Sequence, residues 1–286
     1  MKPLEILSPS RAAGPTQEVV IQPMRGWIPI NWREMVDGRE LLFFLAWRDV
    51  KIRYKQTVLG VAWALIQPLL TMVIFTIVFG RYAGVPYDGV AYAPFVFAGL
   101  IPWTFFSNGV SNSGQSLVTQ QHLLTKIYFP RLFVPTATIG PFLVDMAVSF
   151  GLYAFVLAAY GIVPSWRIVF LPPVIVLTLM VTLGFGYSLA ALTVLYRDVR
   201  YTVPFMLQIL MFVSPIIYPA RMIPPHYRWV LALNPLCGII EAYRACILGT
   251  DLDWGLFTTS VVLTTALFVF GLYFFRKTER RFADIA

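Results

Sequence analysis

The chain is long, apolar and sparingly charged, which excludes most classes of soluble protein. It has 286 residues, of which 58% are hydrophobic and 13% are charged, and its mean hydropathy is +0.71. A soluble domain of this length has about 45–50% apolar and about 25% charged residues. Lipid must solvate much of this chain, so the composition predicts an integral membrane protein.

The net charge of +8 does not indicate a nucleic-acid-binding protein, because the basic residues avoid the apolar stretches. They gather before the first stretch and after the last, where they can anchor the chain beside anionic lipid headgroups. The two cysteines, Cys237 and Cys246, would face opposite sides of one helix, so we expect no disulfide between them. Neither has a second cysteine or a histidine at metal-ligand spacing, so no metal site is suggested.

Residues 1–38 differ from the rest of the chain. They are polar, contain five prolines and have no apolar core of the kind found in a secretory signal. We expect them to form a flexible, partly disordered cytoplasmic tail. Residues 39–286 are expected to form a single transmembrane domain.

Six apolar runs follow the tail, at about 58–80, 91–113, 132–160, 168–195, 202–219 and 255–275. A helix needs about 20 residues to cross a membrane. The fifth run is short and ends in a segment with Pro215 and Pro219, where a regular helix cannot continue without loss of stability. The sequence therefore predicts an all-α integral membrane fold with six transmembrane helices.

The flanking lysines and arginines predict the orientation of these spans. Thirteen lie on one side of the expected membrane and five on the other. Because positive residues are retained on the cytoplasmic side, both termini are expected to face the cytoplasm. An even number of spans agrees with that arrangement.

Residues 39–56 have the pattern of an amphipathic helix that precedes the first span. One stripe is apolar or aromatic: Phe43, Trp47, Val50 and Tyr54. The neighbouring stripe is basic: Arg48, Lys51 and Lys55. Such a helix suits the inner headgroup layer, with its lysine stems along the lipid. The alternative is that this segment is only the extended start of the first span.

Two connections are also expected to be helical. Residues 115–128 are too polar to cross a membrane and predict a short cytoplasmic helix that ends before Pro130. Residues 220–250 are too apolar for a free loop, but no piece of them reaches spanning length. We expect two short helices there that dip into the outer leaflet.

The sequence offers little support for an enzyme. It contains neither a Gly-x-x-x-x-Gly-Lys-Ser/Thr phosphate loop nor a Gly-x-Ser-x-Gly nucleophile elbow, and no catalytic residues are assigned. Asp145 is the one ionisable residue deep within an apolar run. It is either a proton-coupling or substrate-contacting site, or a carboxyl satisfied by a serine, threonine or backbone group of another helix.

Several short segments, in order along the chain, resemble one family of transporters. They are RYKQTVLG at 53–60 with Trp63 and Gln67-Pro68, KIYFPR at 126–131, YRDVR at 196–200, SPIIYP at 214–219, NPL at 234–236 and EAYR at 241–244. Together they are similar to the membrane subunit of polysaccharide-exporting ABC transporters. These permeases move O-antigen, capsule or teichoic acid chains on lipid carriers.

The resemblance implies a role for each segment identified above. Residues 39–56 would be the interface helix, 115–128 a coupling helix docked on a separate ATPase subunit, and 220–250 a pair of gate helices at the outer mouth. The coupling residues would be Gln121, His122, Leu123, Leu124 and Lys126. Two copies of the ABC ATPase would bind ATP and Mg²⁺, so no cofactor is expected on this chain.

The resemblance also implies a homodimer with a canal between the two permeases. Its lining would be Trp63, Gln67, Phe75 and Phe79 from the first span, and Phe205 and Phe212 from the fifth. The basic residues Arg48, Lys51, Arg53 and Lys55 would either attract the pyrophosphate of the lipid-linked polysaccharide or anchor the helix to headgroups of membrane lipids.

The expected function is export of a lipid-linked polysaccharide across a bacterial inner membrane. One alternative is an ABC exporter of a small drug or lipid, which would have the same architecture. Another is a proton-coupled secondary transporter that depends on Asp145. A membrane-embedded glycosyl- or acyltransferase would need a cluster of Asp, Glu or His that is not evident in the sequence.

Overall fold

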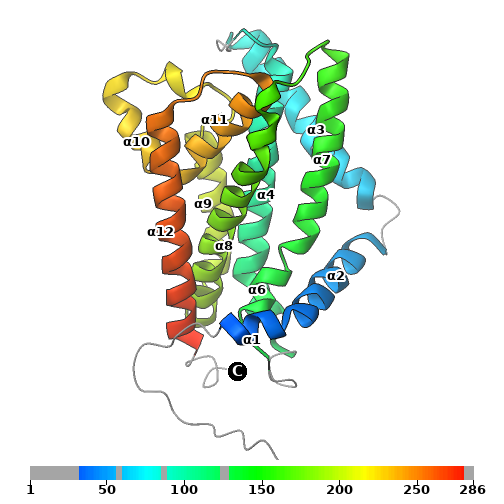
Figure 1. Ribbon diagram of the computed structural model, residues 1–286, viewed down its shortest axis with the longest axis vertical. Coiled ribbons are helices and arrows are strands. Elements are labelled where there is room, and N and C mark those ends of the chain that lie inside the picture. The colour runs from blue at the N-terminus through cyan, green and yellow to red at the C-terminus, as the bar shows by residue number, and fades with distance from the viewer. Residues whose placement is uncertain (1–31, 56–59, 85–88, 123–128, 280–286) are drawn as a thin grey trace, which may run out of the picture.

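A computed structural model describes residues 32–55, 60–84, 89–122 and 129–279. Within these ranges every regular element is helical, and the long helices stand side by side in a bundle (Figure 1). The α-helices are α1 (Trp32–Asp37), α2 (Arg39–Lys55), α3 (Gly60–Phe75), α4 (Tyr92–Thr119), α6 (Phe133–Ala137), α7 (Gly140–Ala159), α8 (Leu171–Leu195), α9 (Val199–Val213), α10 (Arg228–Ala232), α11 (Pro235–Leu248) and α12 (Trp254–Glu279). The π-helix η1 (Thr76–Tyr82) continues α3, and the short 3₁₀ helices are η2 (Trp166–Phe170), η3 (Ala220–Met222) and η4 (Pro225–Tyr227).

The helical segments agree with the all-α membrane fold predicted from hydropathy. Five segments of the described chain are long and apolar enough to cross a membrane: Leu65–Tyr82, Tyr92–Thr119, Phe133–Ala159, Trp166–Leu195 and Trp254–Glu279. The fifth predicted span, at 202–219, is the shorter apolar helix α9, which ends at Val213 rather than 219. The chain leaves the helix just before Pro215, as expected of a proline that cannot donate a backbone hydrogen bond.

Helix α4 is the centre of the bundle. It packs against α3, α7, α8 and α11 (Figure 1). Its first half is buried on every side, with Phe95, Phe97 and Phe106 all fully inaccessible. A helix that is apolar all round is stable only inside a protein or a membrane, so α4 is the element on which the other spans assemble.

Helices α8 and α12 pack closely along their lengths (Figure 1). At their crossing, a Cβ added to Gly271 would lie only 2.2 Å from the carbonyl oxygen of Gly184. Membrane helices commonly associate by close backbone contact at small residues. Lipid tails are as apolar as the side chains, so the hydrophobic effect contributes little to helix association in a membrane. This contact fixes the distance between the two helices.

Residues 220–250 contain two short α-helices, α10 and α11, as expected. Helix α11 packs on α4, α8 and α12, and nearly all of its residues are buried, whereas its depth in the outer leaflet stays a prediction. Its start is set by Asn234, whose side chain accepts a hydrogen bond from the Leu236 amide, and by Pro235 in the first turn. It ends at Gly249, which adopts the left-handed conformation (φ 74°) that favours glycine.

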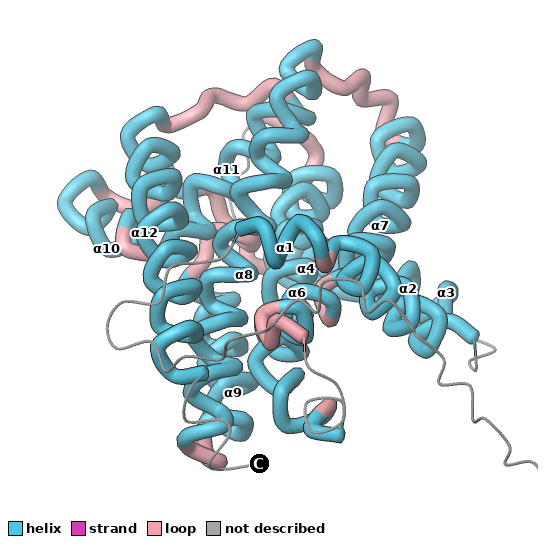
Figure 2. Tube along the Cα trace, turned by 60° about the horizontal axis from the view of Figure 1, so that its bottom comes forward, coloured by secondary structure: helices cyan, strands magenta, loops and turns pink. Residues whose placement is uncertain are grey.

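Helices α1 and α2 lie across one end of the bundle, with α2 against α6 (Figure 2). We call this the α2 end and the opposite end, which carries α10 and α11, the α11 end. Residues 32–37 belong to α1, so the expected flexible tail is helical in its last part, and residues 1–31 lie outside the described chain. Helix α2 occupies nearly all of the predicted 39–56 segment.

Candidate functional site

Helix α2 is held against the bundle by contacts with α6 and α7. Leu45 is buried in that contact, whereas Phe43 and Trp47 are 70% and 49% exposed and stack on each other with ring centroids 6.4 Å apart. Lys51 lies over the Trp47 ring, 5.7 Å from its centroid. The exposed aromatic pair and its lysine form an amphipathic surface suited to a lipid headgroup layer.

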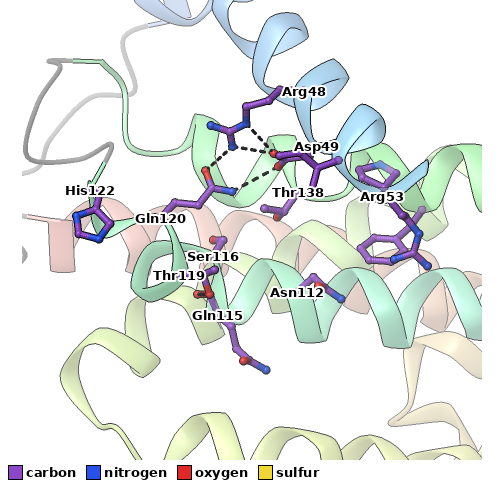
Figure 3. Close-up of a pocket in the computed structure, with 13 residues that line it drawn as sticks. Arg48, Asp49, Arg53, Asn112, Gln115, Ser116, Thr119, Gln120, His122 and Thr138 are labelled. Carbon is purple, nitrogen blue, oxygen red and sulfur yellow. Dashed lines mark hydrogen bonds and ion pairs between the residues drawn. The ribbon is translucent and has the colours of Figure 1, made fainter. Parts of the chain in front are cut away.

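A first polar contact joins α2 to the end of α4 (Figure 3). Arg48 Nη2 is 2.7 Å from Asp49 Oδ1 and donates a hydrogen bond of 2.8 Å to Gln120 Oε1. Gln120 Nε2 in turn donates to Asp49 Oδ2 at 3.4 Å. The closed triangle of donors and acceptors fixes the guanidinium group of Arg48 at the α2 end of α4.

A second polar contact joins α2 to α7 through Asp145. Arg53 Nη2 lies 2.8 Å from Asp145 Oδ2, and the Tyr54 hydroxyl donates a short hydrogen bond to Asp145 Oδ1. Burial and the hydrogen bond to Asp145 together raise the pKa of Tyr54 to about 12, so Tyr54 stays a donor at neutral pH. Asp145 therefore has interhelical partners, but they are an arginine and a tyrosine rather than the serine, threonine or backbone group that was expected.

A polar cavity of about 630 Å³ lies beside Arg48, Asp49 and Arg53 (Figure 3). Among the residues that line it are Arg48, Arg53, Asn112, Gln115, Thr119 and Thr138. The guanidinium, amide and hydroxyl groups of these residues line the same cavity and can together donate several hydrogen bonds to one oxyanion. The cavity is thus a candidate site for a phosphate-bearing group at the α2 end.

The four basic residues predicted to attract pyrophosphate fall into two pairs. Arg48 and Arg53 line the polar cavity and are already ion-paired with acidic groups. Lys51 and Lys55 are exposed and do not line the cavity. The sequence predicted the helix that carries all four, but not this division of the arginines from the lysines.

The predicted coupling segment is only partly described. Helix α4 continues to Thr119, so a separate helix does not begin at residue 115 as expected. Gln121 and His122 are helical and exposed at the α2 end, and His122 also lines the polar cavity. Leu123, Leu124 and Lys126 lie outside the described residues.

The residues predicted to line a canal lie on α3, η1 and α9. Gln67 is exposed on α3, whereas Phe75 and Phe79 are partly buried and pack edge to face with centroids 5.6 Å apart. On α9, Phe205 and Phe212 are 60% and 56% exposed. Trp63 belongs to α3, and its side chain lies outside the described part. Gln67, Phe205 and Phe212 therefore face the surface of the single chain rather than an enclosed passage.

The polar face of α4 was missed from the sequence. Asn112, Gln115 and Thr119 recur every three or four residues, which places them on one face of a helix. That periodicity was visible, but the first half of α4 is so apolar that the run was ended at 113. Asp49 and Gln120 were also missed, since their pairing needs α2 and α4 to be brought together in space.

The contact at Asp145 leads to a first prediction. We expect Asp145→Ala to lower the free energy of unfolding by about 1–2 kcal/mol, because it leaves Arg53 without its carboxylate while part of that guanidinium can still reach water. Thermal unfolding in detergent micelles measures the change. In a double-mutant cycle with Arg53→Ala, the two effects are expected to be less than additive. Full additivity would show that the ion pair contributes nothing.

Comparison with known proteins identifies the class. The family model described as ABC-2 type transporter matches residues 40–248, which is most of the chain and includes every helix from α2 to α11. The chain therefore belongs to the ABC-2 type transporter family and is a multi-pass membrane transport subunit.

Individual relatives in this family have more specific names. The chain is 33% identical over 216 residues to the O-antigen export system permease protein RfbA of Myxococcus xanthus, covering 74% of this chain and 82% of that protein. It is 28% identical over 251 residues to the RfbA permease of Klebsiella pneumoniae, covering 86% and 95%. It is 24% identical over 237 residues to the polysialic acid transport protein KpsM of Escherichia coli, covering 81% and 91%.

Proposed function

We propose that this chain is the membrane subunit of an ATP-driven exporter that moves a lipid-linked polysaccharide out of the cytoplasm across the inner membrane. The observation that carries the proposal is the set of relatives named for O-antigen and polysialic acid transport, which this chain matches over 82–95% of their own lengths. A match that long covers most of the chain rather than one shared motif.

The distribution of charge supports an orientation with the α2 end in the cytoplasm. Helix α2 carries five basic residues, and α12 ends with Arg276 and Lys277 in its last turn at the same end of the bundle (Figure 1). Positive residues beside membrane spans are retained on the cytoplasmic side. Both ends of the transmembrane domain then face the cytoplasm.

The energy for transport would come from a second protein. Membership of the ABC-2 family implies an ATPase partner, and we propose that two copies of it contact two copies of this chain. The exposed turn at Gln121 and His122, with residues 123–126 after it, is the proposed docking segment. The apolar faces of α3 and α9 would meet across the dimer, because these two helices carry residues predicted to line the canal, and Phe205 and Phe212 of α9 are exposed on the single chain.

The polar cavity is the proposed site for the pyrophosphate of the lipid carrier. A pyrophosphate needs several donors at once, and Arg48 and Arg53 stand beside the amides and hydroxyls of α4. Lys51 and Lys55, exposed on the same helix, would raise the local concentration of the anionic headgroup before it enters. Phosphate oxygens would then compete with Asp49 and Asp145 for the two guanidinium groups.

A charge-neutralising variant tests the role of the lysines. We expect Lys51→Gln combined with Lys55→Gln to lower export severalfold while membrane insertion stays normal, because the headgroup loses its attraction to α2. The measurement is surface polysaccharide per permease molecule. The pair Arg197→Gln and Arg200→Gln is the control, because both arginines are exposed, Arg197 between α8 and α9 and Arg200 in the first turn of α9. If export by the lysine variant is unchanged, Lys51 and Lys55 do not attract the pyrophosphate and serve only to anchor α2 to lipid headgroups.

The docking segment is tested by co-purification. We expect Leu123→Asp combined with Leu124→Asp to release the ATPase, because apolar anchors at the centre of an interface carry most of its binding energy. Size-exclusion chromatography checks that the variant permease remains folded. If the ATPase is recovered with this variant in the same amount as with the unaltered chain, residues 121–126 are not the docking segment.

A further inference from the structure

A second cavity, of about 770 Å³, lies at the α11 end and is separate from the polar cavity. It is enclosed by η2 and the start of α8, by the second half of α11 and by the start of α12. Its inner wall is apolar and includes Val174, Leu177, Ala245, Cys246 and Phe257. Its volume is within the range of cavities that hold small molecules.

Two tryptophans place the mouth of this cavity at the surface of the membrane. Trp166 and Trp254 both line it, and each begins one of the segments that are long enough to cross the membrane. Their side chains are 74% and 71% exposed. Because tryptophan at the ends of spans lies at headgroup level, the apolar wall behind them lies at the depth of the acyl chains.

The lining of the cavity includes one cation and one anion, Arg167 and Asp251, that form no ion pair with each other. Arg167 and Asp251 both line it, and within the described residues neither has an ion-pair partner. Arg167 Nη1 donates a hydrogen bond of 3.2 Å to the carbonyl oxygen of Thr250, which holds the guanidinium beside residue 251. An unpaired arginine and an unpaired aspartate at headgroup depth are complementary to a ligand that carries both charges.

We propose that this cavity binds one phospholipid with a primary ammonium headgroup. Its phosphate lies against Arg167, its ammonium donates to Asp251, and one acyl chain fills the apolar interior between α8, α11 and α12. Phosphatidylethanolamine has that chemistry. Phosphatidylglycerol has the phosphate but no cation for Asp251, so the aspartate makes the site selective. The bound lipid joins the short buried helix α11 to the starts of two spans.

Native mass spectrometry of the full chain in detergent, titrated with phosphatidylethanolamine or phosphatidylglycerol of identical acyl chains, tests the proposal. We expect the first lipid to bind about threefold more tightly, as one partly exposed ion pair provides. Asp251→Asn should remove that preference, and Ala245→Phe should weaken binding of both lipids by filling the cavity. The matched controls are Asp198→Asn, an exposed acid at the α2 end, and Val262→Phe, which is 63% exposed on α12.

Equal binding of the two lipids by the unaltered chain would overturn the proposal. A preference that survives Asp251→Asn would overturn it as well, since the ammonium would then be recognised elsewhere. If Ala245→Phe does not fold, Asp251→Asn still decides, because Asp251 is exposed and its replacement disturbs no buried contact.

Discussion

Arg244→Met is expected to destabilise the protein by about 3–5 kcal/mol, the range for breaking a buried ion pair on one side. The Arg244 side chain is fully inaccessible. Its Nη1 lies 3.0 Å from Glu241 Oε1, its Nη2 donates to the Ile216 carbonyl at 2.7 Å, and its Nε donates to the Phe95 carbonyl at 3.2 Å. One guanidinium thus joins α11, α4 and the turn after α9, and its loss leaves Glu241 charged and buried.

The variants around Arg244 distinguish this explanation from simple loss of packing. Arg244→Lys should rescue little, because one ammonium cannot reproduce a planar fork that points to three acceptors. Adding Glu241→Gln to Arg244→Met should recover part of the stability, since the uncompensated carboxylate is then gone. Arg221→Ala, an exposed arginine of the same connection, is the control. Thermal unfolding in detergent measures the stability of all four variants. If Arg244→Met loses no more stability than Arg221→Ala, the role of the buried ion pair is refuted.

The second large effect is expected at the crossing of α8 and α12. Gly271→Ala should lower stability by about 1–3 kcal/mol and Gly271→Leu by more, because overpacking forces rigid elements apart. The atom in the way is the backbone carbonyl of Gly184, which cannot rotate aside as a side chain could. The reciprocal site is equally tight, since a Cβ on Gly184 would lie 2.9 Å from the backbone of Leu267.

A fall of roughly 2–10 °C in the melting temperature of Gly271→Ala would correspond to that loss. Ala266→Leu is a matched control, because residue 266 is on the exposed side of the same helix. If Gly271→Ala and Ala266→Leu melt at the same temperature as the unaltered chain, α8 and α12 do not cross at the described distance.

Hydropathy predicted the spans well because lipid contact is a property of composition over some 20 residues. It did not predict the burial of α11 among the other helices, because its 14 residues contain Glu241 and Arg244. In the count of flanking lysines and arginines, Arg244 was placed among the five basic residues outside the apolar runs on the outer side of the membrane. Its acceptors, the carbonyls of Phe95 and Ile216, are distant in sequence, and no local pattern reveals that a charge will be satisfied by them.

The candidate site was also predictable only in part, because local patterns could be read from the sequence and contacts between distant segments could not. The basic face of α2 could be read from its spacing, because helical periodicity is local. The contact of Asp145 with Arg53 and Tyr54 could not, since it depends on α2 folding back along α7. The polar residues of α4 were visible but were assigned to a separate helix, because a polar stretch was taken to end the span. A 28-residue helix is long enough to cross the membrane and continue beyond it.

The central claim is that this chain exports a lipid-linked polysaccharide, and depletion of the protein in its host tests that claim most directly. The measurement is the amount of lipid-linked polysaccharide on each leaflet of the inner membrane and on the cell surface. The account predicts completed chains accumulating on the inner leaflet together with their loss from the surface. Normal surface polysaccharide without accumulation inside would contradict it, and would leave an exporter of a small molecule or lipid as the function to pursue.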